Sequence, residues 1–297
     1  MSDSHRPRRS VLYMPGSKER ALEKAKTLAA DGLILDLEDA VAPAEKDAAR
    51  EQVKQAVLAG GYGRRELIIR VNGLDTPWGA ADMEAACAAG PDAILIPKVN
   101  SAAQVEETEA LMRKHGAPDK TQIWAMMETP RGMLHAEAIA ASTPRLAAFI
   151  MGTNDLVAEL GAAHTPMRLP VMTGLGLCLL AARAYGVACI DGVFNEFKNV
   201  DAFREACVQS KELGMDGRTL IHPAQVDPCN EVFAPSEEDI SLARRQLHAY
   251  EEAIEKGEAV AVVDGKIVEN LHVETARKVI AMAEIIAEMA EDAGAEE

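Results

Sequence analysis

The chain has 297 residues, 48% hydrophobic and 26% charged, proportions typical of a globular protein that buries a large core. Its 47 acidic and 31 basic residues give a formal charge of −16, a field that excludes nucleic acid and anionic membranes as general partners. The five cysteines have no zinc-ligand spacing, and no apolar segment of about 18 residues is free of charge, so we expect a soluble cytoplasmic protein with reduced thiols.

Short apolar segments alternate with longer amphipathic ones along most of the chain. Most of the short segments are continuously apolar, which is typical of parallel strands covered on both faces. The expected strands are Ser10–Met14, Gly32–Leu37, Leu67–Val71, Ala93–Pro97, Ile123–Met127, Ala147–Met151, Ala188–Val193 and Thr219–Ile221. Expected helices include Glu19–Ala30, Glu45–Ala59, Gln104–Lys114 and Leu175–Tyr185. Eight successive β-then-α units predict an α/β fold of the (β/α)8 TIM barrel type, and no G-x-G-x-x-G follows the first strand.

The pattern changes after Pro223. Ser236 is expected to cap a helix, which a small hairpin with its turn at Asp264–Gly265 and a second helix follow. The expected elements are Glu237–Lys256, Ala259–Val263 paired with Lys266–Val268, Val273–Met289, and a frayed tail at Ala290–Glu297. We therefore predict a catalytic barrel over residues 1–225 and a C-terminal lid and oligomerisation extension over residues 226–297.

Polar residues follow most of the predicted strands, at the end of a barrel where active sites form. Glu128 follows the fifth strand and Asp155 follows the sixth. Neighbouring strand tips lie about 5 Å apart, so these two carboxylates could share one Mg²⁺. The other polar residues at strand ends are Asp36, Glu38, Asp39, Arg70, Asn72, Lys98, Asp191 and His222.

Each of these residues also has a simpler structural explanation. A single carboxylate there could cap the next helix, and Arg70 could form a structural salt bridge. Capping does not explain why several carboxylates converge with an arginine, whose planar guanidinium suits a carboxylate or a developing enolate oxygen. Lys18 and Lys24 flank a glycine turn that could bind phosphate, although surface lysines are equally common.

At these residues the sequence resembles the malyl-CoA lyase and citrate lyase beta-subunit-like family of CoA-ester lyases, which includes malyl-CoA thioesterase paralogues. The similar segments follow the family order over nearly the whole chain. They are Arg9–Ser17, Leu35–Pro43, Ile69–Asn72, Ile96–Lys98, Met127–Pro130, Met151–Leu156 and Thr219–Pro223.

The resemblance implies a barrel with a C-terminal lid that assembles as a homotrimer or homohexamer. It implies that Glu128 and Asp155 hold Mg²⁺, for which Mn²⁺ could substitute. Glu38 and Asp39 would position waters around the metal, and Arg70 would contact the substrate. These residues all lie within the segments that resemble the family.

The resemblance also implies a coenzyme A site and a residue that acts in another subunit. Tyr13, Lys18 and Lys24 match positions that family members use against coenzyme A. Asp264 matches a catalytic aspartate that enters the neighbouring subunit's site. One departure is Arg218, where relatives often carry lysine.

The function that we predict from these features is carbon–carbon cleavage or formation next to a coenzyme A thioester. The substrate would be malyl-CoA, methylmalyl-CoA or citramalyl-CoA, and the products a 2-oxo acid (glyoxylate or pyruvate) and an acyl-CoA. Mg²⁺ would bind the substrate's hydroxyl and carboxylate, Arg70 would stabilise the enolate, and Asp264 would protonate its carbon.

Three alternatives remain open at this stage. A (3S)-malyl-CoA thioesterase would use the same metal site and arginine to hydrolyse the thioester to malate and free CoA. A non-catalytic or carrier-protein-dependent subunit of a citrate-lyase-like complex would not act alone on free CoA esters. A class II pyruvate aldolase would share the barrel and the acidic metal site but would not need Lys18 and Lys24.

Overall fold

A computed structural model describes residues 6–295, which form two compact units. The first unit is Arg8–Phe233. The second contains residues 6–7 and 234–295. Each unit has its own hydrophobic core, so each is described separately.

The first unit is a closed barrel of eight parallel strands, joined in sequence order. β1 pairs with β2 on one side and with β8 on the other, so no strand edge is left open. The predicted TIM-barrel fold is confirmed, and each strand lies within a few residues of its expected position. The strands are β1 (Ser10–Pro15), β2 (Gly32–Asp36), β3 (Glu66–Arg70), β4 (Ala93–Ile96), β5 (Gln122–Met127), β6 (Leu146–Met151), β7 (Ala188–Asp191) and β8 (Gly217–Leu220).

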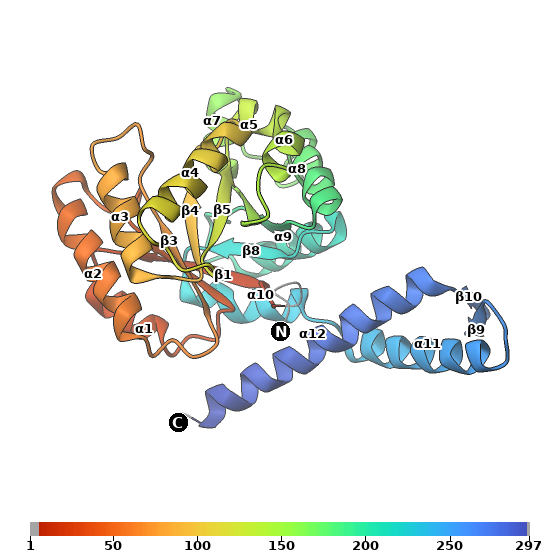
Figure 1. The fold of residues 1–297 in the computed structure, drawn as a ribbon. Helices are drawn as coiled ribbons and strands as arrows, with labels where there is room; N and C mark the ends of the chain where they lie inside the picture. The colour runs from red at the N-terminus through yellow and green to blue at the C-terminus, as the bar shows by residue number, and fades with distance from the viewer. Residues whose placement is uncertain (1–5, 296–297) are drawn as a thin grey trace. The chain divides into compact units, whose positions relative to one another are not determined.

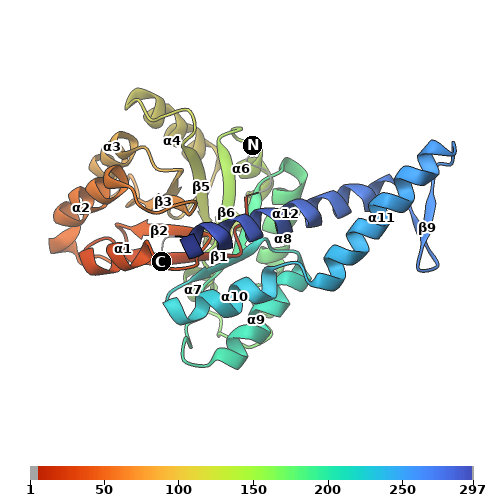
Figure 2. The ribbon, with the colours of Figure 1, turned by 90° about the horizontal axis from the view of Figure 1, so that it is seen from below.

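Helices surround the strands, as Figure 1 and the view from below in Figure 2 show. Each strand is followed by at least one helical segment before the next strand begins. The helical segments are α1 (Glu19–Ala25), η2 (Pro43–Glu45), α2 (Lys46–Ala59), α3 (Gly79–Ala89), α4 (Ala102–Lys114), α5 (Pro130–Leu134), α6 (Ala136–Ala140), α7 (Thr153–Glu159), α8 (Met172–Tyr185), α9 (Val200–Leu213), η3 (Pro223–Gln225) and α10 (Val226–Phe233).

The strands bury apolar side chains on both faces, as their continuous hydrophobicity predicts. A large cluster fills the space between strands and helices, and a smaller one fills the barrel interior. Side chains alternate between these faces, so Val11 and Tyr13 of β1 both face inward. The same alternation directs the last residues of β2 and β3, Asp36 and Arg70, to the upper end of the interior.

Two buried ion pairs stabilise the opposite, amino-terminal end of the barrel. The guanidinium of Arg8 donates to both carboxylate oxygens of Glu66, at 2.7 and 2.8 Å. Arg9 binds Asp31 in the same bidentate manner, at 2.8 Å for both bonds. These pairs join the segment before β1 to β2 and β3. They contribute to stability, and the active sites of TIM barrels form at the other end.

The second unit is a helical hairpin that carries a two-stranded β-hairpin. It consists of α11 (Glu237–Glu255), β9 (Ala261–Val263), β10 (Lys266–Val268) and α12 (Asn270–Ala295), and α11 and α12 lie side by side (Figure 1). Ser236 caps α11 as expected, in a capping box with Asp239. Asp264 and Gly265 form the hairpin turn with φ of 51° and 76°, as a two-residue turn requires.

Two expectations about this region differ from the structure. The last helix begins at Asn270 rather than Val273. Its backbone stays helical to Ala295, so the predicted fraying is wrong for residues 290–295. Residues 296–297 lie outside the described part of the chain. The expected boundary after residue 225 falls just before α10, which the structure groups with the barrel. The assignment of lid and oligomerisation roles to residues 226–297 stays a prediction.

Within residues 6–295, no helix is both long and apolar enough to cross a membrane. All five cysteines are buried and free.

Candidate active site

Arg70 is the centre of a charged cluster at the carboxyl end of the barrel. Its side chain is buried at the end of β3, and it binds both oxygens of Asp36 on β2, at 2.7 and 2.6 Å. Arg70 Nη1 also lies 2.7 Å from Glu38 Oε2 and 3.6 Å from Asp39 Oδ2. The structure therefore brings together three of the predicted site residues, Arg70, Glu38 and Asp39. Asp36, which we had not assigned to the site, orients the arginine.

Tyr13 lies beside this cluster, inside the barrel. The Arg70 guanidinium carbon is 4.9 Å from the centre of the Tyr13 ring, a cation–π distance. The Tyr13 hydroxyl donates weakly to Met126 Sδ at 3.6 Å. Burial raises the pKa of Tyr13 well above its ordinary value, so the phenol stays protonated. Tyr13 therefore lies inside the barrel, in contact with Arg70.

Glu128 and Asp155, the predicted metal ligands, follow the neighbouring strands β5 and β6. Glu128 directly follows β5 and is 2% exposed, and its Oε1 accepts from the backbone N–H of Lys98 at 2.8 Å. Asp155 lies in the first turn of α7. Burial raises the pKa of Glu128, and the nearby charge of Asp155 raises it further. The two carboxylates are thus close enough to repel each other.

A glycine shapes the space around Glu128. A Cβ atom on Gly152 would lie 2.3 Å from Glu128 Cβ and 2.5 Å from its Oε2. Such distances are far inside van der Waals contact, so any larger residue would displace the carboxylate. Gly152 precedes α7 and therefore allows Glu128 and Asp155 to approach the same point.

Lys98 lies among the carboxylates of the site. Burial lowers its pKa, but Asp155, Glu128, Glu38 and Asp39 together raise that pKa above its ordinary value. All four predicted carboxylates therefore lie near enough to Lys98 to act on its charge. Lys98 also has φ of 48°, which is unusual for a non-glycine residue and is typical of strain held at functional sites. We had noted Lys98 only as a strand-end residue; the sequence carries no signal for its backbone strain.

The geometry fits a hard divalent cation. In the described part of the chain, no group of three or more His, Cys, Asp or Glu side chains could hold a metal. Glu128 and Asp155 would supply two carboxylates, so a metal held there would need waters or substrate oxygens to complete its shell. Mg²⁺ usually binds proteins in this way, through one or two carboxylates and several waters. The charge of Asp155 raises the pKa of Glu128, and a bound cation would relieve this repulsion.

A cavity of about 860 Å³ opens beside this cluster, between the loops after β3, β4 and β5. Glu38 and Lys98 line it, so the cavity adjoins the charged residues, whereas Arg70, Glu128 and Asp155 do not line it. Most of its other lining groups are polar. They include Asn72, Thr76, Asn100, Gln104, Thr129 and Arg131. Its size suits a small polar ligand.

The remaining predicted site residues lie apart from this cluster. Lys18 precedes α1 and Lys24 lies in its last turn, both exposed, and Lys18 is 3.9 Å from Glu45. Asp264 belongs to the second unit, where both of its carboxylate oxygens accept from Arg245, at 2.6 and 2.8 Å. The roles of these residues toward coenzyme A and a neighbouring subunit stay predictions.

Two strand-end residues have structural roles instead. Asp191 ends β7 but binds Arg168 and Arg218 rather than joining the carboxylates around Lys98. It also binds Ser210 of α9, so it faces away from the barrel interior. His222 caps η3 and stacks on Phe197 at 4.7 Å. The expectation that Asp191 converges on the site was wrong, because strand alternation directs it outward.

Comparisons with known proteins show the family to which the chain belongs. The family model described as HpcH/HpaI aldolase/citrate lyase matches residues 9–223. A (3S)-malyl-CoA thioesterase of Cereibacter sphaeroides is 56% identical over 97% of this chain and 98% of its own length. An L-malyl-CoA/beta-methylmalyl-CoA lyase of that species is 35% identical over 95% and 96%. The solved structure of CitE from Mycobacterium tuberculosis in complex with magnesium, acetoacetate and coenzyme A has a TM-score of 0.73 at 29% identity, covering 93% of this chain and 97% of that one.

These identities overturn the prediction that the chain is primarily a carbon–carbon lyase. The thioesterase is similar over the whole chain at a much higher identity than the lyase. The lyase prediction was wrong because the motifs on which it relied occur in both activities.

Proposed function

The chain belongs to the HpcH/HpaI aldolase/citrate lyase family, and on that premise we propose that it is a magnesium-dependent thioesterase that hydrolyses (3S)-malyl-CoA to malate and free coenzyme A. The observation that carries this proposal is the full-length similarity to a (3S)-malyl-CoA thioesterase. The cluster around Arg70 and Lys98 supports it, because it offers an anionic metal site and a fixed cation side by side.

Glu128 and Asp155 would hold the metal at the barrel mouth. When bound, Mg²⁺ would bind the hydroxyl and carboxylate of the malyl group and fix its orientation. Gly152 provides the space that Glu128 needs, and the Lys98 N–H holds one carboxylate oxygen in place. The relatives' magnesium complexes support this choice of ion.

Arg70 would stabilise the charge that develops on the thioester oxygen during attack by water. Its guanidinium is held at two nitrogens by Asp36, so it needs no rearrangement during the reaction. Glu38 and Asp39 also contact its Nη1, at 2.7 and 3.6 Å, and help to balance the buried charge.

Glu38 would act as the general base. Burial raises the pKa of Glu38 to about 7, although Arg70 acts in the opposite direction. A carboxylate with such a pKa can accept a proton efficiently near neutral pH. Water would lose a proton to Glu38 and form a bond to the thioester carbon, the C–S bond would break, and the proton would pass to the departing thiolate.

The remaining site residues would bind the coenzyme and complete the site. Lys18 and Lys24 are exposed and suit the coenzyme A phosphates, whereas Tyr13 would contact the acyl end. We retain Asp264 as a residue contributed by a second subunit of a homotrimer or homohexamer. Hydrolysis transfers no proton to carbon, so Asp264 would not act as the acid that protonates an enolate carbon.

A product assay tests the proposal. The purified protein is incubated with (3S)-malyl-CoA and Mg²⁺, and free thiol, malate, glyoxylate and acetyl-CoA are measured together. We expect malate and free CoA in equal amounts, and loss of both in a Glu128→Gln variant. Glyoxylate with acetyl-CoA as the main products would refute hydrolysis. Activity on this free ester would also exclude dependence on a carrier protein.

A further inference from the structure

The turn after β2 holds Glu38 through both of its backbone polar groups. The Glu38 N–H donates to Asp36 Oδ1 at 2.9 Å, and the Glu38 carbonyl accepts from Lys46 Nζ at 2.9 Å. Its carboxylate lies 2.7 Å from Arg70 Nη1. Two buried side chains of opposite charge therefore fix the peptide groups on either side of the Glu38 Cα.

Lys46 is an unusual residue for this purpose. It begins α2 and is only 5% exposed. Its ammonium donates to three neutral oxygens, those of Leu37 and Glu38 at 2.9 Å and Asn72 Oδ1 at 2.7 Å. These bonds use all three N–H donors, and the Trp78 ring lies 5.0 Å from the nitrogen.

A second layer of buried bonds keeps the acceptors of Lys46 in place. Asn72 donates to the Leu37 carbonyl at 2.8 Å and to Asp82 Oδ2 at 2.6 Å. Asp82 is fully buried and binds Arg50 of α2 at 2.6 Å. The network thus links α2 and α3 to the turns after β2 and β3.

Burying an ammonium without a direct carboxylate partner is costly, so stability alone does not explain Lys46. An apolar side chain of similar length would avoid that cost, but it would leave the Glu38 carbonyl and Asn72 Oδ1 without this buried donor. What the ammonium provides is a fixed position for the Leu37 and Glu38 carbonyls, and hence for the Glu38 carboxylate at the edge of the cavity.

We propose that Lys46, together with Asp36, is a positioning residue that sets the Glu38 carboxylate and Arg70 for the reaction. This proposal rests on the proposed function, in which Glu38 accepts the proton of the attacking water. Without Lys46, two backbone carbonyls would lose their buried donor and the turn would shift. A displacement of about 1 Å at a reacting group lowers a rate by about 100-fold.

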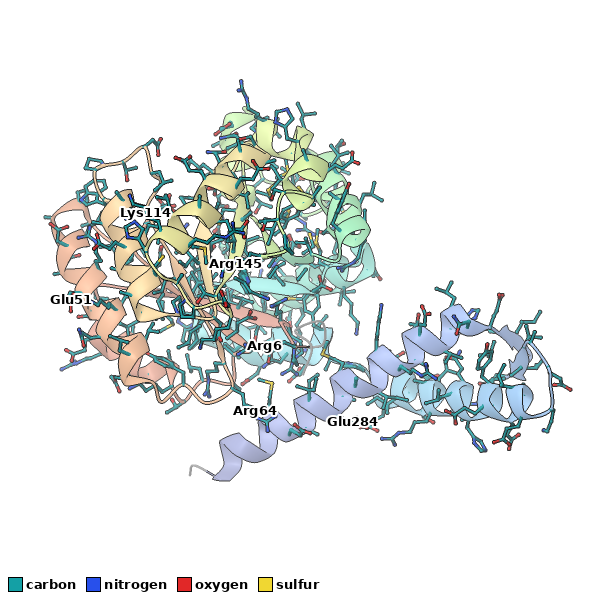
Figure 3. The ribbon with its side chains drawn as sticks, in the orientation of Figure 1. Arg6, Glu51, Arg64, Lys114, Arg145 and Glu284 are labelled. Atoms are coloured by element: carbon teal, nitrogen blue, oxygen red, sulfur yellow. The ribbon has the colours of Figure 1, made fainter. Side chains whose placement is uncertain are left out.

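The first test compares Lys46→Met with Lys54→Met. Lys54 is on the same helix and 31% exposed, 3.9 Å from Glu51, which Figure 3 shows on the outer surface of α2. We expect kcat for malyl-CoA hydrolysis to fall by about 10- to 100-fold in Lys46→Met, with little change in KM. Lys54→Met should match the unchanged protein. Equal kcat in both variants would overturn the proposal.

A double-mutant cycle separates positioning from a general structural effect. If Lys46 acts through Glu38, Lys46→Met should cause no further loss of kcat in a Glu38→Gln background. Losses that multiply in the double variant would mean that the two residues act independently. Lys46→Gln, a milder change, replaces Lys46→Met in the cycle if the latter does not fold.

Hydrogen exchange tests the proposal without any turnover. The Glu38 and Ala40 amides donate to Asp36, at 2.9 and 3.1 Å. Their exchange should accelerate about 10-fold or more in Lys46→Met but not in Lys54→Met, while amides of β5 stay protected. Unchanged exchange would overturn the positioning role. Absence of malyl-CoA hydrolysis in the unchanged protein would instead refute the proposed function and leave this measurement valid.

Discussion

Glu38 and Glu128 both have raised pKa values, but a bound metal ion would keep Glu128 ionised, which leaves Glu38 as the titrating group. Burial raises its pKa to about 7, so the group is protonated below that pH and unable to accept a proton. We therefore predict that kcat/KM for hydrolysis rises about tenfold per pH unit below about pH 7 and levels off above it. A pH–rate profile of the metal-saturated enzyme measures this.

Asp39→Asn is the matched control, because Asp39 contacts the same arginine but is exposed. The rise near pH 7 should persist in Asp39→Asn and disappear from the residual activity of Glu38→Gln. A rise that persists unchanged in Glu38→Gln would assign it to another group.

Asp191 contributes to the stability of the fold rather than to the proposed reaction. Burial raises the pKa of Asp191, but Arg218, Arg168 and Ser210 together lower that pKa by more, so the net shift is downward. A lowered pKa in the folded state means that Asp191 stabilises the fold above the unfolded-state pKa, and that this contribution is lost as the pH falls through the folded-state pKa.

Asp191→Asn should therefore cost about 3–5 kcal/mol of unfolding free energy at neutral pH, because it leaves two arginines without their carboxylate. Urea denaturation measures the loss. Asp201→Asn, an exposed acid in the first turn of α9, should cost less than about 1 kcal/mol. Equal losses in both variants would contradict the role given to the buried network.

At this scale the sequence predicts the residues of the site better than their partners. Glu38, Asp39, Arg70, Glu128 and Asp155 follow apolar strands, so their position at the barrel mouth can be predicted. Asp36 and Lys46 also stand in or near these segments, but their roles depend on which neighbour each one contacts. Those contacts arise from packing between elements distant in sequence, which a single sequence does not specify.

Among the elements, the junction between β6 and α7 has a strict steric requirement that bears directly on the site. A Cβ on Gly152 would collide with Glu128 at its Cβ, which is not a flexible end that could move away. Gly152→Ala should therefore displace Glu128 and raise the Mg²⁺ concentration for half-maximal hydrolysis by at least about tenfold. Mg²⁺ titration of the activity, with direct measurement of Mn²⁺ binding, provides the readout.

Gly176→Ala in α8 serves as the control, because a Cβ there would meet no atom within 4 Å. It should leave the metal requirement unchanged. Normal Mn²⁺ affinity in Gly152→Ala would show that Glu128 is not a ligand at this position.

The strands were easier to predict than the ends of the helices. Continuous apolar segments with glycine or polar boundaries locate all eight strands, because burial on both faces demands that pattern. The first helix ends at Ala25 rather than Ala30, and α12 extends past its apolar pattern. Helix ends depend on capping and tertiary contacts, which leave a weaker trace in the sequence.

For the molecule as a whole, the charge of −16 opposes the binding of an anionic coenzyme except where cations gather. Lys18 and Lys24 are exposed near the first helix, so we predict that their joint replacement by glutamate raises KM for malyl-CoA about tenfold at low salt while kcat is retained. The effect should shrink as salt is added, because the Debye length is about 10 Å at 0.1 M.

Steady-state kinetics at several salt concentrations measure this effect. Lys114→Glu, at the end of α4 and labelled in Figure 3, controls for the general change in charge. An equal rise of KM in Lys114→Glu would contradict a local phosphate site at Lys18 and Lys24.

The fold of the whole barrel unit can be predicted from the sequence, but its reaction is harder to predict. In the proposed site, hydrolysis and carbon–carbon cleavage would both use Arg70 and a metal held by Glu128 and Asp155. The outcome depends on whether water reaches the thioester carbon, and hence on positions of Å scale that the motifs do not encode. That is why the sequence alone favoured the lyase, whereas similarity over the whole chain favours the thioesterase.

The most direct test of the proposed hydrolysis is the fate of oxygen from the solvent. The protein is given (3S)-malyl-CoA and Mg²⁺ in H₂¹⁸O, and the products are analysed by mass spectrometry. Hydrolysis predicts malate that carries one ¹⁸O in its new carboxylate, formed in step with free CoA. Acetyl-CoA and glyoxylate as the products, with no labelled malate, would contradict it.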